Sequence, residues 1–329
     1  MKTYIFTAKD IEKHLTMEVA IESVEDGYKL YSEKKALVPP VVSIEVEKHH
    51  GEIDIKSSVD LEENITCVKI ASGYWNNIKH YGLPTGLGTI LLFDARNGAL
   101  LAVMEGGLIT DMRTGAAGAV SAKYMARKDS KTAAIIGTGV IARMQLRALL
   151  TVFELEEVFV WGRNKENLDQ YVNDMNSEYP SLSIQKCDTA GECVSKADIV
   201  ITTTASKGPL FKKEDVKPGT HIACIGADME GKQEIDENLF SNATIVVDSI
   251  DQCRTKGEIE TALKKGIIQE SDIQAEIGEI ILGNKIGRKD NDEITIFDST
   301  GLSVQDIATA KNVFQRLMHE ENILKVDLV

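Results

Sequence analysis

Three small residues follow a short apolar run near the middle of the chain. Gly137, Gly139 and Ala142 come directly after the run 132–136 and open a segment with helical spacing. The first glycine permits a tight turn, the second lets a pyrophosphate approach the backbone at a helix N-terminus, and the small third residue allows close helix packing. Strand, turn, helix and a second strand in this order predict a dinucleotide site rather than an ordinary strand-to-helix turn. The expected contacts are Gly137, Thr138, Gly139 and Val140.

The second strand after this turn ends in a basic residue. NAD-specific sites usually carry Asp or Glu at that point for the ribose hydroxyls, whereas a nearby arginine accommodates the 2′-phosphate of NADP. Residues 160–165 contain no acid but do contain Arg163. The sequence therefore favours NADP(H) over NAD(H) as the cofactor, and the alternative is that Arg163 only covers exposed surface.

Three further charged residues stand beside apolar segments. Lys69 lies in the strand-like run 66–70, Arg113 precedes a run of small residues, and Asp228 follows the apolar run 221–225. A guanidinium can clamp a carboxylate with two parallel hydrogen bonds, and an aspartate at the carboxyl edge of a parallel sheet can act as a general acid or base. The alternatives are a surface lysine on an edge strand, a structural ion pair for Arg113, and a turn-shaping aspartate.

The elements that must position these residues fall into two groups. A helix is predicted over 7–24, and Asn97-Gly98 predicts a hairpin. Short strands are predicted over 41–46, 53–56, 66–70, 89–93 and 99–104. This first group indicates a mostly antiparallel sheet with a helix.

Strands and helices alternate in the second group. Helices are predicted over 114–126 and 165–179, and strands over 132–136, 158–161, 199–202, 221–225, 245–248 and 294–297. This alternation predicts an α/β fold, a Rossmann-type doubly wound parallel sheet, beside a smaller α+β substrate-binding and dimerisation domain. We expect the smaller domain to comprise 1–115 with 305–329, and the dinucleotide-binding domain 116–304.

Composition excludes several classes of function. The formal net charge of −14 disfavours nucleic acid and anionic membranes as partners, and no apolar run reaches the roughly 18 residues of a membrane helix. The five cysteines and six histidines show no metal-ligand spacing, so we expect no metal and reduced thiols. The first residues lack the pattern of a signal peptide, and we expect a cytoplasmic protein.

Five separated motifs, in order along the chain, resemble the ornithine cyclodeaminase/mu-crystallin family. They are Lys69 and the segments 82–86, 108–117, 226–234 and 297–301. Within that family, segments 51–56 and 160–163 are most similar to the ectoine-utilisation and iminosuccinate reductase-type branch. The resemblance implies an enzyme of amino-acid metabolism that forms a homodimer through its N-terminal sheet domain.

The resemblance also implies site residues. The substrate lysine and arginine of the family fall on Lys69 and Arg113, and its catalytic aspartate falls on Asp228. Cofactor contacts fall on Thr85, the Gly137–Gly139 turn, Arg163, Thr202, Asp228, Lys232 and Ser299.

One departure from the family bears on the substrate. Family members with cyclodeaminase activity carry an arginine in the N-terminal sheet, but this chain has no arginine before Arg96. Asp54 and Lys56 are two residues apart and so lie on one face of a strand. Lys56 would suit a substrate with a second carboxylate and would repel the ammonium group of ornithine; alternatively, Asp54 and Lys56 neutralise each other.

The leading hypothesis is an NAD(P)-dependent oxidoreductase that acts on the carbon–nitrogen bond of an amino or imino acid, with a dicarboxylic imine such as iminosuccinate as the preferred substrate. Lys69 and Arg113 would hold the carboxylate or polarise the imine, and Asp228 would handle the proton. The alternatives are a cyclodeaminase-type ammonia-lyase that recycles NAD internally, and a non-catalytic binding protein like mu-crystallin.

Overall fold

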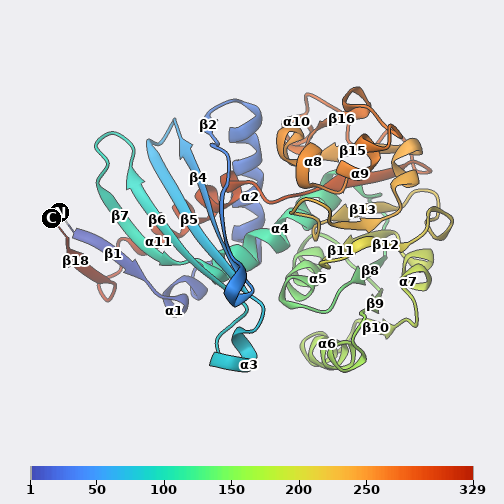
Figure 1. Cartoon of the computed structure of the whole chain (residues 1–329), viewed down its shortest axis with the longest axis horizontal. Coiled ribbons are helices and arrows are strands. Elements are labelled where there is room, and N and C mark those ends of the chain that lie inside the picture. The colour runs from blue at the N-terminus through green and yellow to red at the C-terminus, as the bar shows by residue number, and fades with distance from the viewer. Residues whose placement is uncertain (1, 329) are drawn as a thin grey trace. The chain divides into compact units, whose positions relative to one another are not determined.

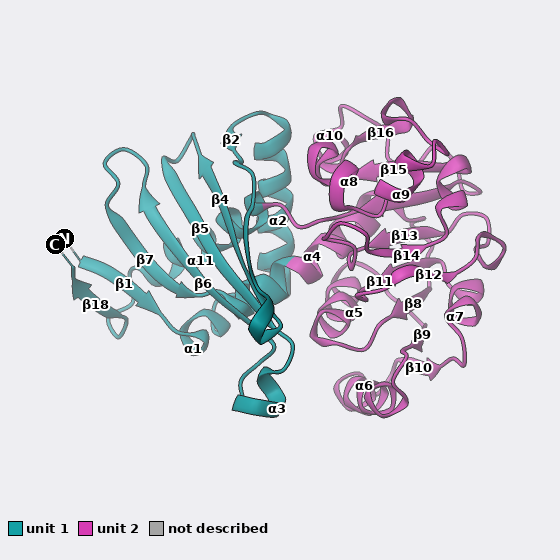
Figure 2. Cartoon of the chain, viewed as in Figure 1, with its two compact units in different colours: residues 1–113, 303–329 teal, residues 114–302 magenta. Residues whose placement is uncertain are grey.

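The computed structural model describes residues 2–328 and divides the chain into two compact units (Figure 2). Unit 1 comprises residues 1–113 with 303–329, and unit 2 comprises residues 114–302. These boundaries differ by two residues from the predicted ones. Helix α4 (Gly107–Met125) begins in unit 1 and ends in unit 2.

Unit 1 is built on one mixed sheet. Its strands are β1 (Lys2–Phe6), β2 (Ala36–Leu37), β3 (Val42–Val46), β4 (Gly51–Asp60), β5 (Ile65–Tyr74), β6 (Gly86–Asp94), β7 (Leu100–Glu105) and β18 (Leu324–Asp327). They pair in the order β18-β1-β7-β6-β5-β4-β2, with β3 on β4, and every pairing except β1 with β7 is antiparallel. The predicted hairpin is present, since β6 and β7 are antiparallel neighbours and Gly98 has the positive φ of 76° that such a turn requires.

Unit 1 also contains several helices, and one of them packs on the sheet. They are α1 (Ala8–Glu12), α2 (Met17–Ser32), α3 (Asn77–Tyr81) and α11 (Ser303–Leu317), with a 3₁₀ turn at Glu47–His49. Helix α11 packs on β4, β5, β6 and α2 (Figure 1). Gly27 of α2 allows that approach, because a Cβ there would meet the Val304 carbonyl oxygen at 2.6 Å.

The prediction of one helix over 7–24 was wrong. Two caps nine residues apart divide the segment, because Thr7 accepts a hydrogen bond from the Asp10 amide and Thr16 accepts one from the Val19 amide. The second helix then continues to Ser32, since its buried face extends to Tyr28.

Unit 2 contains an eight-stranded sheet in which every pairing is parallel. Its strands are β8 (Thr132–Ile136), β9 (Glu157–Trp161), β10 (Ser183–Lys186), β11 (Ile199–Thr202), β13 (His221–Cys224), β15 (Ala243–Val247), β16 (Ile273–Glu276) and β17 (Ile294–Asp298). The order is β10-β9-β8-β11-β13-β17-β15-β16. The chain leaves β8 in one direction and returns to β11 on its other side, which is the topological switch of a Rossmann fold.

Helices connect these strands. They are α5 (Val140–Val152), α6 (Lys165–Glu178), α7 (Ala190–Lys196), α8 (Ile250–Lys256), α9 (Glu260–Lys264) and α10 (Ile277–Ile281), with 3₁₀ turns at Lys213–Asp215, Glu237–Asn242 and Glu270–Asp272. Two short strands, β12 (Lys207–Phe211) and β14 (Gln233–Ile235), pair with each other. Helices α5 and α7 both pack on β8, on either side of it in Figure 1.

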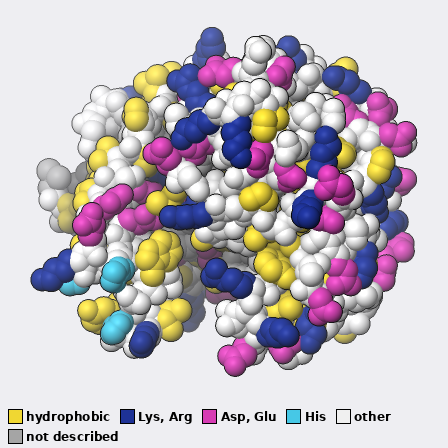
Figure 3. Space-filling view, turned by 45° about the vertical axis from the view of Figure 1, so that its right-hand side comes forward, with side chains coloured by type: hydrophobic (Ala, Val, Ile, Leu, Met, Phe, Trp, Pro, Cys, Tyr) yellow, Lys and Arg dark blue, Asp and Glu magenta, His cyan; other side chains and the backbone are white. Residues whose placement is uncertain are grey.

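Charged side chains of both signs are mixed on one face of the protein. Lys and Arg side chains alternate with Asp and Glu side chains on the face shown in Figure 3, and no large area of one sign is visible there. Among residues 2–328, no helix is long and apolar enough to cross a membrane. The same residues contain no group of His, Cys, Asp and Glu that would hold a metal ion.

Candidate functional site

Three charged side chains meet in the interior of unit 1. Lys69 on β5 is 1% exposed, Arg113 on α4 is 7% exposed, and Asp306 on α11 is fully buried. Asp306 Oδ1 lies 2.8 Å from Lys69 Nζ and 3.0 Å from Arg113 Nε. One carboxylate oxygen therefore faces two cations. Side chains this deeply buried stay charged only when they have close partners, because taking each charge out of water costs free energy.

Neutral side chains complete the cluster. Arg113 Nη1 donates to Gln305 Oε1 at 2.9 Å, and Gln305 Nε2 donates to the hydroxyl oxygen of Tyr28 at 2.8 Å. Two atoms lack a hydrogen-bond partner among the described residues: Asp306 Oδ2, and Arg113 Nε, whose contact with Oδ1 is not aligned as a hydrogen bond.

The electrostatics of the cluster leave an excess of positive charge. Burial and the charge of Arg113 lower the pKa of Lys69 to about 7. Burial alone would raise the pKa of Asp306, but the charges of Lys69 and Arg113 outweigh it and hold that pKa below its usual value. Asp306 is therefore ionised, and Lys69 exchanges its proton near neutral pH. Such a cluster favours an anionic ligand and can also transfer a proton.

Lys56 adds to this charge. It lies directly opposite Lys69 in the register of β4 and β5, so both side chains leave the sheet on the same face. Lys56 is half-buried, and its charge lowers the pKa values of both Lys69 and Asp306. A second cation next to Lys69 is the structural basis for considering a second carboxylate in the substrate.

The sequence identified only part of this cluster. Lys69 is not a surface lysine on an edge strand, because β5 is paired on both sides. Arg113 does not precede a helix beginning at 114; it lies within α4, which starts at Gly107, and it forms the ion pair that was the alternative interpretation. Asp306 was missed, although an acidic residue between Val304 and Ile307 on the buried face of a helix was the available signal.

The glycine turn of unit 2 has the shape of a phosphate cradle. Gly137 has a φ of 127°, and a Cβ there would collide with the Thr203 hydroxyl. A Cβ on Gly139 would meet nothing within 4 Å, so the space before the N-terminus of α5 is open. Backbone amides facing open space at a helix N-terminus fit the pyrophosphate of a dinucleotide.

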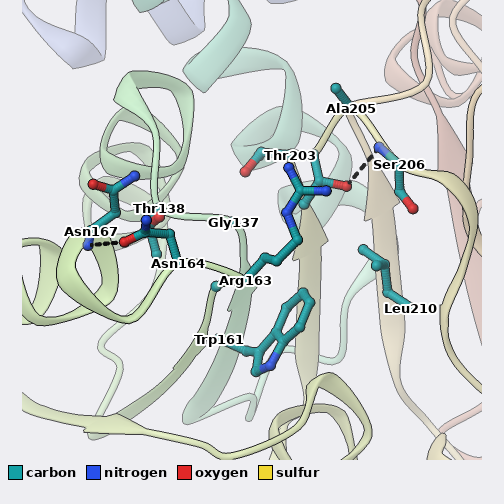
Figure 4. Close-up of a pocket in the computed structure, with 12 residues that line it drawn as sticks. Gly137, Thr138, Trp161, Arg163, Asn164, Asn167, Thr203, Ala205, Ser206 and Leu210 are labelled. Carbon is teal, nitrogen blue, oxygen red and sulfur yellow. Dashed lines mark hydrogen bonds between the residues drawn. The ribbon is translucent and has the colours of Figure 1, made fainter.

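A groove continues from this turn between the ends of β9 and β11 (Figure 4). It is lined by Gly137, Thr138, Trp161, Gly162, Arg163, Asn164, Asn167, Thr203, Thr204, Ala205, Ser206 and Leu210. In Figure 4 the Arg163 side chain extends over the groove from the strand end beside Trp161, toward Thr203. None of these lining residues is acidic, so the groove favours an anionic ligand.

Other predicted cofactor residues lie away from the lining of this groove. The Thr202 hydroxyl is buried and donates to Glu234 at 2.6 Å, and the Ser299 hydroxyl donates to Asp248 at 2.9 Å. Asp228 is half exposed and forms an ion pair with Lys232 at 2.5 Å. Thr85 belongs to unit 1, in the loop before β6, where its carbonyl accepts the Tyr74 amide, and Val140 is exposed at the start of α5.

Replacing Asp306 with Asn tests whether the cluster depends on this carboxylate. D306N leaves two buried cations without a counter-charge, so the free energy of unfolding should fall by about 3 kcal/mol or more. The loss should shrink as pH rises from 7 toward 10, because neutralising Lys69 removes one of the two cations. Urea unfolding at several pH values measures this loss.

The matched control for this variant is D60N. Asp60 is also buried and also binds α11, through Lys311 at 2.7 Å, but it lies outside the cluster, and its lysine has a second partner in Glu63. Equal losses for D306N and D60N, with the same pH dependence, would contradict a special role for Asp306.

Solved structures of known proteins share the fold of this chain. An archaeal alanine dehydrogenase, solved as a dimer with bound NAD, superimposes with a TM-score of 0.93 at 37% identity, covering all of both chains. The iminosuccinate reductase of Paracoccus denitrificans in complex with NAD⁺ gives a TM-score of 0.93 at 32% identity, again covering all of both chains. Both relatives are oxidoreductases, and the fold of this chain is the Rossmann-type fold that they use.

Sequence comparison agrees with the structural likeness. The alanine dehydrogenase of Archaeoglobus fulgidus is 39% identical over 318 residues, which is 97% of this chain and 96% of that protein. A solved lysine cyclodeaminase is more distant, at 26% identity with a TM-score of 0.88, covering all of this chain and 96% of that one. The sequence profile of the ornithine cyclodeaminase/mu-crystallin family matches residues 1–321, and the chain belongs to that family.

Proposed function

We propose that this protein is an NAD(P)-dependent oxidoreductase that acts on the carbon–nitrogen bond of an amino or imino acid. The observation that carries the proposal is the buried cluster of Lys69, Arg113 and Asp306, whose excess positive charge suits the carboxylate of such a substrate. Membership of a family whose near relatives include alanine dehydrogenase and iminosuccinate reductase supports the type of reaction.

The residues of unit 2 would hold the cofactor. The Gly137–Val140 turn would bind the pyrophosphate through backbone amides, and Arg163 would face the adenosine ribose. Thr85, Asp228 and Lys232 stay as proposed contacts. Thr202 and Ser299 would act through backbone atoms, since their hydroxyls already have partners. A bound nicotinamide dinucleotide would supply or accept the hydride.

The residues of unit 1 would hold the substrate. Arg113 would bind the α-carboxylate through its guanidinium group. Lys69 would hydrogen-bond the same carboxylate or polarise the imine, and its pKa of about 7 lets it exchange a proton at the substrate nitrogen. Asp228 is the second candidate for that proton transfer, and the ion pair with Lys232 holds its carboxylate in place.

Lys56 favours a dicarboxylic substrate such as iminosuccinate over ornithine. A second carboxylate beside Lys69 would be attracted by Lys56, whereas the side-chain ammonium of ornithine would be repelled. The charge at this position is the reason to prefer an imine reductase over an ammonia-lyase. The intact buried cluster likewise disfavours a non-catalytic binding role.

A crossed screen of keto acids with amines, using NADH and NADPH, tests the proposal. We expect cofactor oxidation with oxaloacetate plus ammonia. K56M should lower kcat/KM for that pair by about 10- to 100-fold, because it removes one charge-assisted contact, and should change kcat/KM for pyruvate plus ammonia by much less. Turnover of ornithine to proline and ammonia without net cofactor oxidation would support the rival lyase instead.

We propose NADP(H) as the preferred form of the cofactor. The support is Arg163, exposed at the end of β9, in a groove whose lining contains no acidic side chain that would repel a 2′-phosphate. The two relatives with bound cofactor were solved with NAD, so Arg163 is the residue to test.

R163A should raise the KM for NADPH by about 10-fold or more, the effect of losing a charged hydrogen bond, while leaving the KM for NADH within about twofold. K212A removes an exposed cation outside the groove lining and serves as the control. Equal effects of R163A on both cofactors would contradict the preference.

We also propose that the protein forms a homodimer through unit 1 and works in the cytoplasm. Unit 1 exposes large apolar side chains on β2, β3, α3 and the loop before α3, namely Leu37, Val42, Ile44, Trp75, Ile78 and Tyr81. Exposed apolar groups of this size usually mark an interface, and the archaeal alanine dehydrogenase is a dimer. The five cysteines are all unpaired and buried, which suits a reducing compartment.

I78E tests this interface, because Ile78 is 70% exposed and a charge there would disfavour its burial between two copies. We expect light scattering to show a dimer for the unmodified protein and mainly monomer for I78E. I286E is the control, since Ile286 of unit 2 is 63% exposed. A dimer that survives I78E but dissociates in I286E would place the interface elsewhere.

A further inference from the structure

Unit 2 buries two carboxylates that the proposed reaction does not use. Glu234 lies on β14 and Glu258 precedes α9; both are at most 1% exposed. All the hydrogen bonds that the structure describes for the two carboxylates come from backbone amides or a threonine hydroxyl, and none comes from Lys or Arg. Burying two acids with only neutral hydrogen-bond donors destabilises the folded protein. The position of the pair indicates a role that offsets this cost.

Glu234 connects the loops that follow two neighbouring strands. Its Oε1 accepts the Thr204 amide at 2.5 Å, and its Oε2 accepts the Thr202 hydroxyl at 2.6 Å and the Gly226 amide at 2.9 Å. Thr202 ends β11, and Gly226 follows β13. The carboxylate therefore fixes both loops at the carboxyl edge of the parallel sheet, where ligands of such folds bind.

One of these loops is a wall of the dinucleotide groove. Thr203, Thr204, Ala205 and Ser206 line the groove, and in Figure 4 Thr203 and Ser206 lie on the side toward which Arg163 extends. The Ser206 amide donates to the Thr204 hydroxyl at 3.2 Å, so the position of Thr204 sets that of the next turn. Glu234 itself does not line the groove.

Glu258 holds Glu234 in place. Its carboxylate accepts the Glu234 amide at 2.8 Å and the Ile235 amide at 2.8 Å. Burial raises the pKa of both carboxyl groups, that of Glu234 to about 7, and the charge of Glu234 raises that of Glu258 further.

We infer that Glu234, held by Glu258, is a positioning residue for the groove wall 203–206, and that tight binding of the dinucleotide requires the ionised carboxylate that accepts all three hydrogen bonds. The inference rests on the proposed function only in taking this groove as the cofactor site. A carboxamide at position 234 has one acceptor atom instead of two, so at least one of the Thr204 and Gly226 amides would lose its partner. Gly226 lies close to both groups, because a Cβ at this position would meet the Thr204 carbonyl oxygen at 2.3 Å and Glu234 Oε2 at 2.5 Å.

The test is equilibrium binding of NADH and NADPH, followed by nucleotide fluorescence without substrate. At pH 8 we expect E234Q to raise the Kd by about 10-fold or more, and E258Q to raise it by less. E276Q is the matched control and should stay within about twofold of the unmodified protein. Glu276 is a partly buried acid of the same sheet that also accepts a backbone amide, from Ile250, but it lies on the edge strand β16.

The pH profile separates positioning from a general effect on folding. The pKa of Glu234 is raised, so its ionised form is lost as pH falls through about 7, and the Kd of the unmodified protein should rise over that range. Glu258, Cys224 and Asp298 are the other titratable groups near the pair. E234Q should show a weaker dependence, because the titrating carboxylate is gone, and thermal unfolding at each pH identifies the folded range.

The outcomes are distinct. An E234Q Kd equal to that of the unmodified protein, or an unchanged pH profile in E234Q, overturns the inference and leaves the proposed function standing. Absence of NADH and NADPH binding by the unmodified protein overturns both. If E234Q does not fold, E258Q is measured in its place, because Glu258 holds the backbone of residues 234 and 235. A Kd raised at pH 8 then supports the inference, and an unchanged Kd overturns it.

Discussion

The site in unit 1 depends on one carboxylate oxygen shared by two buried cations. Asp306 Oδ1 lies within 3.0 Å of both Lys69 Nζ and Arg113 Nε. The three residues belong to three elements that are far apart in the sequence. Without that carboxylate, the two cations would be buried with no counter-charge, and neutral partners would not offset the cost of taking them out of water. With Asp306 in place, one carboxylate faces two cations, Lys69 and Arg113. This excess of positive charge is the basis for binding an acidic substrate.

Unit 2 also buries charged groups, but these are anions. There the buried charges are carboxylates, Glu234 and Glu258, and backbone amides rather than cations stabilise them. A carboxylate that accepts hydrogen bonds from the backbone of two loops fixes the positions of both loops. A carboxylate paired with a lysine fixes mainly the lysine side chain. Burial raises the pKa of Glu234 and lowers that of Lys69, both to about 7. Each unit thus contains a group that titrates near neutral pH, because burial disfavours the charged form of both groups.

Predictions from the sequence succeeded where a signal is local. The turn at Gly137 and Gly139 needs only its own residues and two flanking elements, and the hairpin at Asn97-Gly98 needs only its two strands. They failed where two local signals compete. The run 7–24 has helical spacing throughout, but Thr7 and Thr16 each begin a helix, and the hydrogen bond of a cap outweighs continuous periodicity.

By itself the sequence indicated the order of most strands and helices, the glycine turn and the family motifs, and it identified Lys69 and Arg113 as candidate site residues. Only the tertiary structure showed that Asp306 joins those two residues, that Lys56 lies opposite Lys69 across two strands, and that Glu234 supports the wall of the groove. The physical reason is separation along the chain. Asp306 is 237 residues from Lys69 in the sequence, and the two side chains lie 2.8 Å apart in the structure. This contact and the burial of Asp306 make it the centre of the cluster, and the residue type alone encodes neither of them.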